Sequence, residues 1–320
     1  MRYELFAAAA VMALAGSALA QPADNSAPVS IVVQSPNPAT ARQFVHSIAL
    51  APASPGTLAR WGRSICPGVA GARAEVAQAI IDRVARRANA VGVTTGAPGC
   101  TPNLLIVLTS DSDRFAQGVS TQRREALLSP PGIESSTLGE AAFTTFISTP
   151  RPVRWWHVAQ TTMADGEVLA DTRSSSATGA GAAAASVSAM SGAMTPSAGE
   201  GVGSVNSTRA DGTRLRASTR QDLNYVLVIV DTQRASGATV NALADYVAFI
   251  SLAQVNPNVN TASYPSILNL FNEQRNGARP TEMTSWDLAY LDGLYHASRS
   301  ARSGAQQEDE IARRMTSPRS

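Results

Sequence analysis

Two long apolar runs constrain the fold of this chain more than any other feature. Residues 103–111, NLLIVLTSD, and residues 223–231, LNYVLVIVD, are apolar over most of their length instead of alternating with polar residues. A strand with one covered face alternates, whereas a strand covered on both faces is apolar at nearly every position. We therefore expect both runs to be central strands of a sheet that is covered on both faces.

Other segments have the spacing of amphipathic helices. Residues 71–91 place their apolar side chains on one stripe, at Val76, Ile80, Val84 and Ala88. The charged side chains of this segment lie largely elsewhere, and we expect them on the helix surface and not in a binding patch: Glu75, Asp82, Arg83, Arg86 and Arg87. Residues 40–51 and 283–299 are also predicted helices, and Thr284 or Ser285 is the expected N-cap of the latter.

A third strand is predicted at residues 151–160, RPVRWWHVAQ, where the side chains alternate. This pattern is typical of a strand at the edge of a sheet or of one that is covered on one face. Trp155, Trp156 and His157 allow two interpretations. They bind a partner, or one indole ring belongs to the core, the other covers the sheet, and His157 alternates with them.

The composition indicates one packed domain with a large insertion. Residues 174–208 contain a single charged residue, Glu200, and lack the bulky side chains needed to offset ordering entropy, so we expect a disordered, low-complexity insertion. The remaining residues are enough for one substantial core. We predict a leader with a strand and a helix at 21–69, an α+β domain at 70–297, and a polar tail at 298–320 that is loose apart from a turn or two of helix.

The N-terminus and the cysteines both indicate export. Residues 1–20 contain Arg2, an apolar run and the sequence ALA at 18–20, which is the pattern of a signal peptide with its cleavage site. Cys66 and Cys100 are the only cysteines, and two thiols in an oxidising compartment normally pair. Closing a loop of this size contributes about 3 to 4 kcal/mol in the chain-entropy treatment. We expect a periplasmic or secreted protein.

Charge and hydropathy exclude two classes of partner. Every basic residue is arginine, the net charge is +2, and the arginines are scattered, so the sequence predicts no nucleic-acid surface. No segment after the signal peptide has the roughly 18 apolar residues that a membrane span requires.

Asp111 and Asp113 flank a serine in the sequence DSD. A turn or a helix N-cap is the preferred interpretation of this segment, and a cation site is the alternative.

Short segments in the C-terminal part follow one another in a recognisable order. Residues 242–254, ALADYVAFISLAQ, have the character of a buried helix, and they precede SILN at 266–269 and MTSWDLAYLDGLY at 283–295. This order resembles the C-terminal half of a matrixin-like zincin, a zinc peptidase, and the resemblance covers roughly 70–297 without the insertion. It implies an α+β fold in which a mixed, twisted sheet carries two long helices. The chain is also similar to a family of secreted alphaproteobacterial proteins without an assigned activity.

The metal ligands of the zincin pattern are missing. Zincins place two histidines four residues apart on a helix, with a glutamate after the first. This chain has Ala244, Asp245 and Ala248 at those positions, and alanine has no atom that binds zinc. We therefore expect no catalytic zinc and no cofactor, and we expect small apolar residues to fill the former site. Asp245 is either a carboxylate paired with an arginine or a functional residue.

Three functions follow from these patterns. The first is a non-catalytic, exported protein that binds a peptide or protein partner by strand addition at the predicted edge strand, using Trp155, Trp156 and His157. The second is an envelope hydrolase with an unrecognised active site, in which Asp245 acts with His157 or His296; these groups must then lie within about 4 Å or one water of each other. The third is a structural role in the cell envelope, served by the insertion and the tail.

Overall fold

The computed structural model describes residues 37–50, 57–130, 135–166 and 216–317 of the chain. The predicted signal peptide, the predicted insertion and the strand predicted for the leader at residues 28–34 lie outside these residues. All described residues belong to one compact unit, which spans Ser35–Ser320.

The centre of the unit is a mixed sheet with the strand order β2-β3-β6-β5-β4, and β1 pairs separately with β6. Strands β1, β2, β3 and β6 run parallel to one another, whereas β5 is antiparallel to both β6 and β4. With eight α-helices in the described residues, the fold is α+β, as the sequence predicted at this level. The strands are β1 (Arg60–Trp61), β2 (Pro67–Ala70), β3 (Leu104–Thr109), β4 (Ser135–Ser136), β5 (Val153–Met163) and β6 (Thr219–Asp231).

The two apolar runs are the adjacent parallel strands β3 and β6 at the middle of the sheet, and their prediction as central strands is confirmed. Their side chains alternate between two faces. One face, called here the closed face, carries Leu104, Ile106, Val226 and Val228, which are completely buried. The other, called the open face, carries Leu105, Val107, Tyr225 and Leu227, of which Leu105 and Tyr225 are only partly buried.

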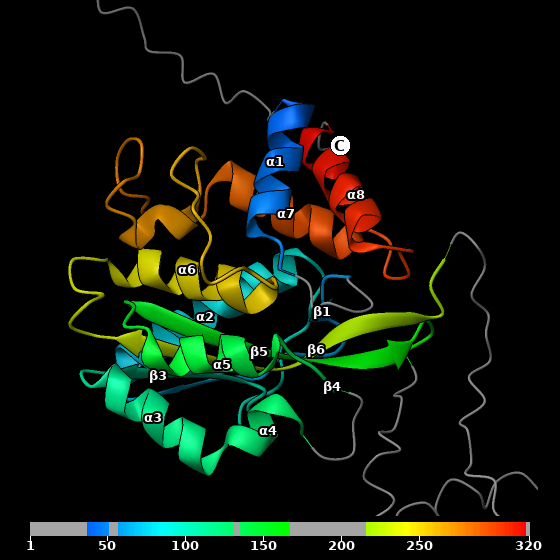
Figure 1. Ribbon diagram of the computed structural model, residues 1–320. Coiled ribbons are helices and arrows are strands. Elements are labelled where there is room, and N and C mark those ends of the chain that lie inside the picture. Colours follow the sequence, from blue (N-terminus) through cyan, green and yellow to red (C-terminus); the bar gives the residue numbers. More distant parts are fainter. Residues whose placement is uncertain (1–36, 51–56, 131–134, 167–215, 318–320) are drawn as a thin grey trace, which may run out of the picture. The chain divides into compact units, whose positions relative to one another are not determined.

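Two layers of helices cover the closed face (Figure 1). The inner layer consists of α2 (Ala74–Ala90) and α6 (Val240–Leu252), and the outer layer consists of α1 (Pro38–Ile48), α7 (Ser285–His296) and α8 (Gly304–Thr316). Every residue of α6 from Ala242 to Leu252 is buried, because the sheet lies on one side of this helix and other helices lie on the remaining sides. A helix that is apolar all round requires such a position.

The described parts of the predicted leader (21–69) and of the predicted tail (298–320) both pack against this core. In the leader, β1 pairs with β6, and Phe44 of α1 packs edge-on against Trp286 of α7. The predicted loose tail is wrong for Gly304–Thr316, which forms α8. This helix buries Ile311 and Met315 against its neighbours, because its few apolar residues share one helical face.

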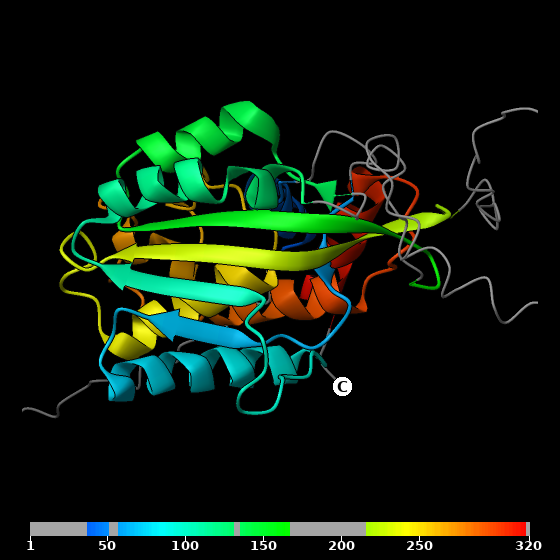
Figure 2. The ribbon, with the colours of Figure 1, turned by 90° about the horizontal axis from the view of Figure 1, so that it is seen from below.

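The open face is covered unevenly. Helices α3 (Ser112–Gln122), α4 (Arg124–Leu128) and α5 (Gly139–Ser148) gather on the β5 side, where Phe143 and Phe146 pack against Trp156. Figure 2 views this face and has no helix in front of β2 and β3. The prediction that β3 and β6 are covered on both faces is therefore incomplete, since a covering layer is absent at Leu105 and Tyr225 among the described residues.

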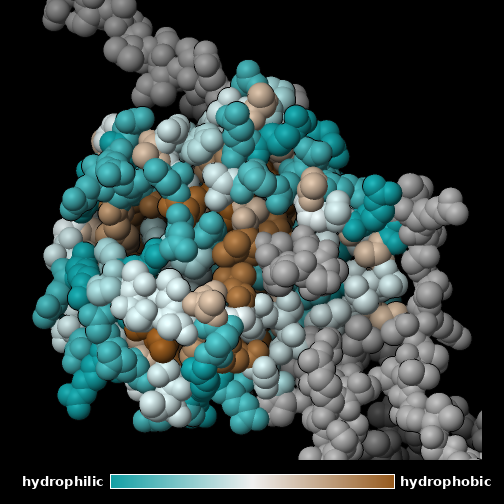
Figure 3. Space-filling view, in the orientation of Figure 1, coloured by the Kyte–Doolittle hydropathy of each residue, from teal (hydrophilic) through white to brown (hydrophobic). Residues whose placement is uncertain are grey.

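Cys66 and Cys100 form a disulfide, which confirms the predicted pairing and ties the start of β2 to the loop before β3. In the orientation of Figure 1, the described surface is mostly hydrophilic or neutral, with apolar residues gathered in a limited area at its middle (Figure 3). The described helices include none with the length and apolar character needed to cross a membrane.

Candidate functional site

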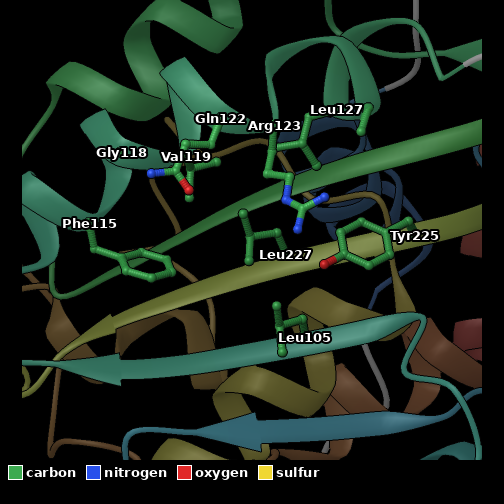
Figure 4. A pocket seen from close by; sticks show the side chains of 10 residues that line it. Leu105, Phe115, Gly118, Val119, Gln122, Arg123, Leu127, Tyr225 and Leu227 are labelled. Atoms are coloured by element: carbon green, nitrogen blue, oxygen red, sulfur yellow. The ribbon is translucent and has the colours of Figure 1, made fainter.

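A cleft of about 620 Å³ lies on the open face, between the strands β3 and β6 and the helices α3 and α4. We call it the open-face cleft. Its floor is formed by Leu105, Tyr225 and Leu227, and its wall carries Phe115, Val119 and Arg123 (Figure 4).

Simple periodicity places these side chains together. Alternate residues of the adjacent strands point to the same face of a sheet, so Leu105 and Leu227 form one continuous floor; they are direct partners in the β3–β6 register. On α3, positions three or four apart share a helical face, so Phe115, Gly118 and Val119 face the cleft together. Gly118 leaves open space at the wall, since a Cβ atom at this position meets nothing within 4 Å.

The open-face cleft has one polar end. Arg123 joins α3 to α4, and Figure 4 shows its guanidinium group between Leu227 and the ring of Tyr225. Within the described residues, no ion pair or hydrogen bond engages this guanidinium group or the Tyr225 hydroxyl. Burial raises the pKa of Tyr225, and the positive charge of Arg123 opposes this increase. The phenol is therefore a neutral hydrogen-bond donor at ordinary pH.

The lining of the cleft is mainly apolar. Its described lining residues include no carboxylate, histidine, serine or cysteine. General base and nucleophilic catalysis by such groups needs a pair of them within hydrogen-bond reach of the substrate. The cleft thus offers a mainly apolar surface with one cation, one hydroxyl and the amide of Gln122.

Asp245 lies away from this cleft, completely buried between α6, α2 and the segment before α7. Its two carboxylate oxygens accept hydrogen bonds of 2.8 Å each from Arg87, and Arg83 lies 3.6 Å away. The backbone N–H of Met283 donates a further bond of 2.9 Å. Of the two interpretations of Asp245, the geometry matches the carboxylate paired with arginine.

This arrangement corrects the prediction for the helix at 71–91. Arg83 and Arg87 were expected on the free helix surface, but their side chains are only 16% and 18% exposed. They turn toward α6, because the buried carboxylate of Asp245 needs compensating charge. The hydrogen bond and the charge of Asp245 in turn raise the pKa of Arg87.

Ala244 and Ala248 lie in the closed-face core, where both are almost completely buried. Neither lines the open-face cleft. In the part of the chain that the structure describes, no group of three or more His, Cys, Asp or Glu side chains is arranged to hold a metal ion.

His157 forms a hydrogen bond with a carbonyl group at the C-terminal end of α6. The last carbonyl groups of a helix have no partner within the helix. Here the Nε2–H of His157 donates to the carbonyl of Ile250 at 2.7 Å, Trp61 donates to that of Ser251, and the Tyr295 hydroxyl donates to that of Leu252. Burial lowers the pKa of His157 to about 4, and the bond to the Ile250 carbonyl opposes this shift only in part. The imidazole is therefore neutral at ordinary pH.

The two tryptophans of β5 are buried on opposite faces of the sheet. Trp155 donates its indole N–H to the carbonyl of Val255 at 3.0 Å, and Trp156 donates to that of Leu127 at 2.8 Å. The prediction of a strand with one covered face is wrong for the first part of β5, because packed layers lie on both sides of Val153–Ala159. The strand is close to the edge of the sheet, since β4 pairs only with Ala159 and Gln160.

The groups of the hydrolase hypothesis have separate partners. His296 is exposed and lies 3.2 Å from Asp292, whereas His157 contacts Ile250 and Asp245 contacts the α2 arginines. Within the described residues, no hydrogen bond or ion pair joins Asp245 to either histidine. The DSD segment is a helix start, because Asp111 accepts a bond from the Arg114 N–H as the N-cap of α3.

The residues of the open-face cleft were not singled out in the sequence. One signal was available: Tyr225 places a hydroxyl inside an otherwise apolar run. The spacing of Phe115 and Val119 after the N-cap at Asp111 was a second, weaker signal. Neither signal predicts that the helices leave part of the central strands uncovered.

No protein-family model, curated protein or solved structure matches this chain. Inferences about function accordingly depend on the geometry of the described residues.

Proposed function

We propose that this protein is an exported, non-catalytic binding protein that holds an apolar ligand in the open-face cleft. The cleft itself carries the proposal. Its volume of about 620 Å³ falls within the roughly 300 to 1,000 Å³ of ligand-binding pockets, which are mainly apolar with a few polar groups. The floor is rigid, because it belongs to the two central strands.

Two observations support a role without catalysis. The lining of the cleft has no pair of groups for acid–base or nucleophilic chemistry. Elsewhere, the charge of Asp245 is compensated by two arginines, and His157 is used as a helix cap.

Export is proposed from the N-terminal sequence, and the disulfide supports it. Disulfides such as Cys66–Cys100 persist in oxidising compartments and are rare in the reducing cytosol. A periplasmic or secreted location is consistent with both features.

The proposal is tested with N-phenyl-1-naphthylamine, a neutral apolar probe whose fluorescence rises on binding. Gly118→Phe fills the cleft from α3, and Gly118→Ala is the matched control; a Cβ atom at this position meets nothing within 4 Å, so neither change creates a backbone clash. We expect saturable binding to the mature protein, a loss of affinity of tenfold or more in Gly118→Phe, and little change in Gly118→Ala. Absence of saturable binding, or equal binding by the Phe variant, refutes the proposal.

A peptide partner is the second candidate, and the backbone of β5 favours it. The Asp231 N–H donates to the Pro152 carbonyl, so alternation in the antiparallel ladder directs the N–H and C=O groups of Val153, Trp155 and His157 away from β6. No described strand pairs with this side of β5 before Ala159. Strand addition requires a neighbouring segment to move, because all three residues are nearly buried.

Amide hydrogen exchange tests this candidate. A peptide selected from a display library for binding to the mature protein is expected to protect the amides of Val153, Trp155 and His157. Protection confined to the residues of the open-face cleft excludes strand addition at β5.

We also propose that the closed face has a zincin-like origin. Its order of elements supports this: the long helix α2, the strand β3, the antiparallel β5 and the buried β6 precede α6. The combined variant Ala244→His, Asp245→Glu and Ala248→His is expected to gain one zinc ion and to become more heat-stable when zinc is added. A folded variant that takes up no zinc contradicts the zincin-like origin and leaves the cleft proposal untouched.

A further inference from the structure

We infer that the ligand of the open-face cleft is a single-chain amphiphile with a carboxylate head, of the long-chain fatty-acid type, held by Arg123 and Tyr225. This inference depends on the proposed function and adds the chemical class of the ligand. It is carried by the polarity of the two ends of the cleft.

The two ends differ in chemistry. Arg123 and Tyr225 lie together at one end, and Phe115 lies at the other, with Leu227 between them (Figure 4). The remaining lining residues are apolar apart from Gln122, an exposed residue whose uncharged amide lies beside Val119 (Figure 4). A ligand that matches this arrangement has an anionic group at one end and a mainly apolar chain along the remainder. A neutral apolar molecule makes no charge-assisted hydrogen bond with the exposed Arg123 guanidinium group, which then stays bound to water.

The charge of Arg123 is available to a ligand. Its neighbour Arg124 forms an ion pair with Glu140, and Arg234, near the start of α3, contacts Asp113 and Asp231. No such acid engages Arg123 among the residues that the structure describes. Arginine presents a planar fork of N–H donors that fits the two oxygens of a carboxylate.

Tyr225 supports the same head group. Its hydroxyl has no hydrogen-bond partner within the described residues, and in Figure 4 it lies on the side of the ring that faces Leu227 and Leu105. As a neutral phenol it donates a hydrogen bond to a carboxylate without repelling it. The partial burial of the ring also extends the apolar floor beneath the first carbons of the chain.

The concave shape favours a single free molecule over a membrane surface. The cleft encloses about 620 Å³ between a sheet and two helices. A flat bilayer surface cannot enter such a space, whereas one extended or bent alkyl chain fits into it. The proposed source of the carboxylate is therefore a monomeric fatty acid.

The inference is tested with dodecanoate and dodecanol, which share a chain length and differ in the head group, both used below the concentration at which they aggregate. The affinity of each is measured by its displacement of N-phenyl-1-naphthylamine from the mature protein and from the variants Arg123→Gln and Tyr225→Phe. The control variant is Arg114→Gln, because Arg114 is an exposed arginine of α3 outside the cleft. We expect Arg123→Gln to weaken dodecanoate about fivefold, as for the loss of a solvent-exposed ion pair, and Tyr225→Phe to weaken it to a smaller extent. The affinity for dodecanol is expected to stay unchanged in these variants, and Arg114→Gln is expected to bind dodecanoate as the unsubstituted protein does.

The outcomes separate the inference from the proposed function. If the naphthylamine probe binds but Arg123→Gln leaves dodecanoate unchanged, or weakens dodecanol equally, the head-group inference is wrong and the apolar site remains. If no apolar molecule binds, both fail. If the protein binds phosphatidylglycerol vesicles and not monomeric dodecanoate, a membrane surface replaces the fatty acid and the inference is overturned.

Discussion

Polar side chains have opposite environments on the closed face of the sheet and at the open-face cleft. On the closed face, Asp245 and His157 are buried and each is engaged by protein groups. On the open face, Arg123 and Tyr225 border a cleft and have no recorded partner in the described part of the chain. Residues that attract attention in a sequence can therefore be used for packing, while a binding surface arises from residues with ordinary patterns.

Energetics explains this difference. A buried charge is costly unless other groups in the interior compensate it, so Asp245 fixes the positions of Arg83 and Arg87. A charge at the surface keeps its hydration and needs no such partner. The closed face is thus expected to be sensitive to small changes, and the open-face cleft is expected to tolerate them.

The largest effect is expected from Asp245→Ala. It leaves two partly buried guanidinium groups and the Met283 N–H without their acceptor, and breaking a buried ion pair costs about 3 to 5 kcal/mol. Urea unfolding measures the change, with Asp292→Ala on exposed α7 surface as the control, expected within about 0.5 kcal/mol. A loss below about 1 kcal/mol in Asp245→Ala contradicts the contrast between the faces.

The next effect is a pH dependence that comes from His157. Its pKa is about 4 in the folded protein and about 6.5 when unfolded. The depressed folded value means that protonation favours unfolding, so stability is lost as the pH falls from 6.5 toward 4, by roughly 3 kcal/mol in total. His157→Gln keeps an N–H donor and does not titrate, so the stability difference between wild type and variant is expected to shift by this amount.

The comparison with His157→Gln also removes the contribution of Asp287 to the pH dependence of stability, which has the opposite sign. Burial raises the pKa of Asp287 to about 6, while its hydrogen bonds with Ser266, Ile267 and Thr284 lower it. This group therefore favours the folded state on acidification, but it is present in both proteins and cancels in the difference. A stability difference that stays constant between pH 7 and pH 4 excludes a buried, neutral His157.

The smallest effects come from a matched pair of enlargements, each read by thermal unfolding. Ala248→Leu overpacks the closed-face core, which costs about 1 to 3 kcal/mol. Gly118→Leu enters the open-face cleft and replaces a helical glycine, so we expect a gain within about 1 kcal/mol. Equal destabilisation by the two changes implies that the open face is as tightly packed as the closed face.

Much of the fold could be predicted because local patterns report it. The runs that became β3 and β6, the stripe of α2 and the capping box of α7 at Thr284 follow from period and capping chemistry. The disulfide follows from there being two cysteines. The tail was misjudged because α8 has a low mean hydropathy, although Ile311 and Met315 share a face.

The sequence by itself determined which segments form strands and helices and which side chains leave water, since both depend on spacing along the chain. Only the tertiary structure decided what those side chains meet. Arg87 and Asp245 are 158 positions apart and carry no mark of their pairing. The open-face cleft likewise exists because α3 and α4 leave part of the central strands uncovered, and the relative placement of layers depends on packing between distant segments and not on local periodicity.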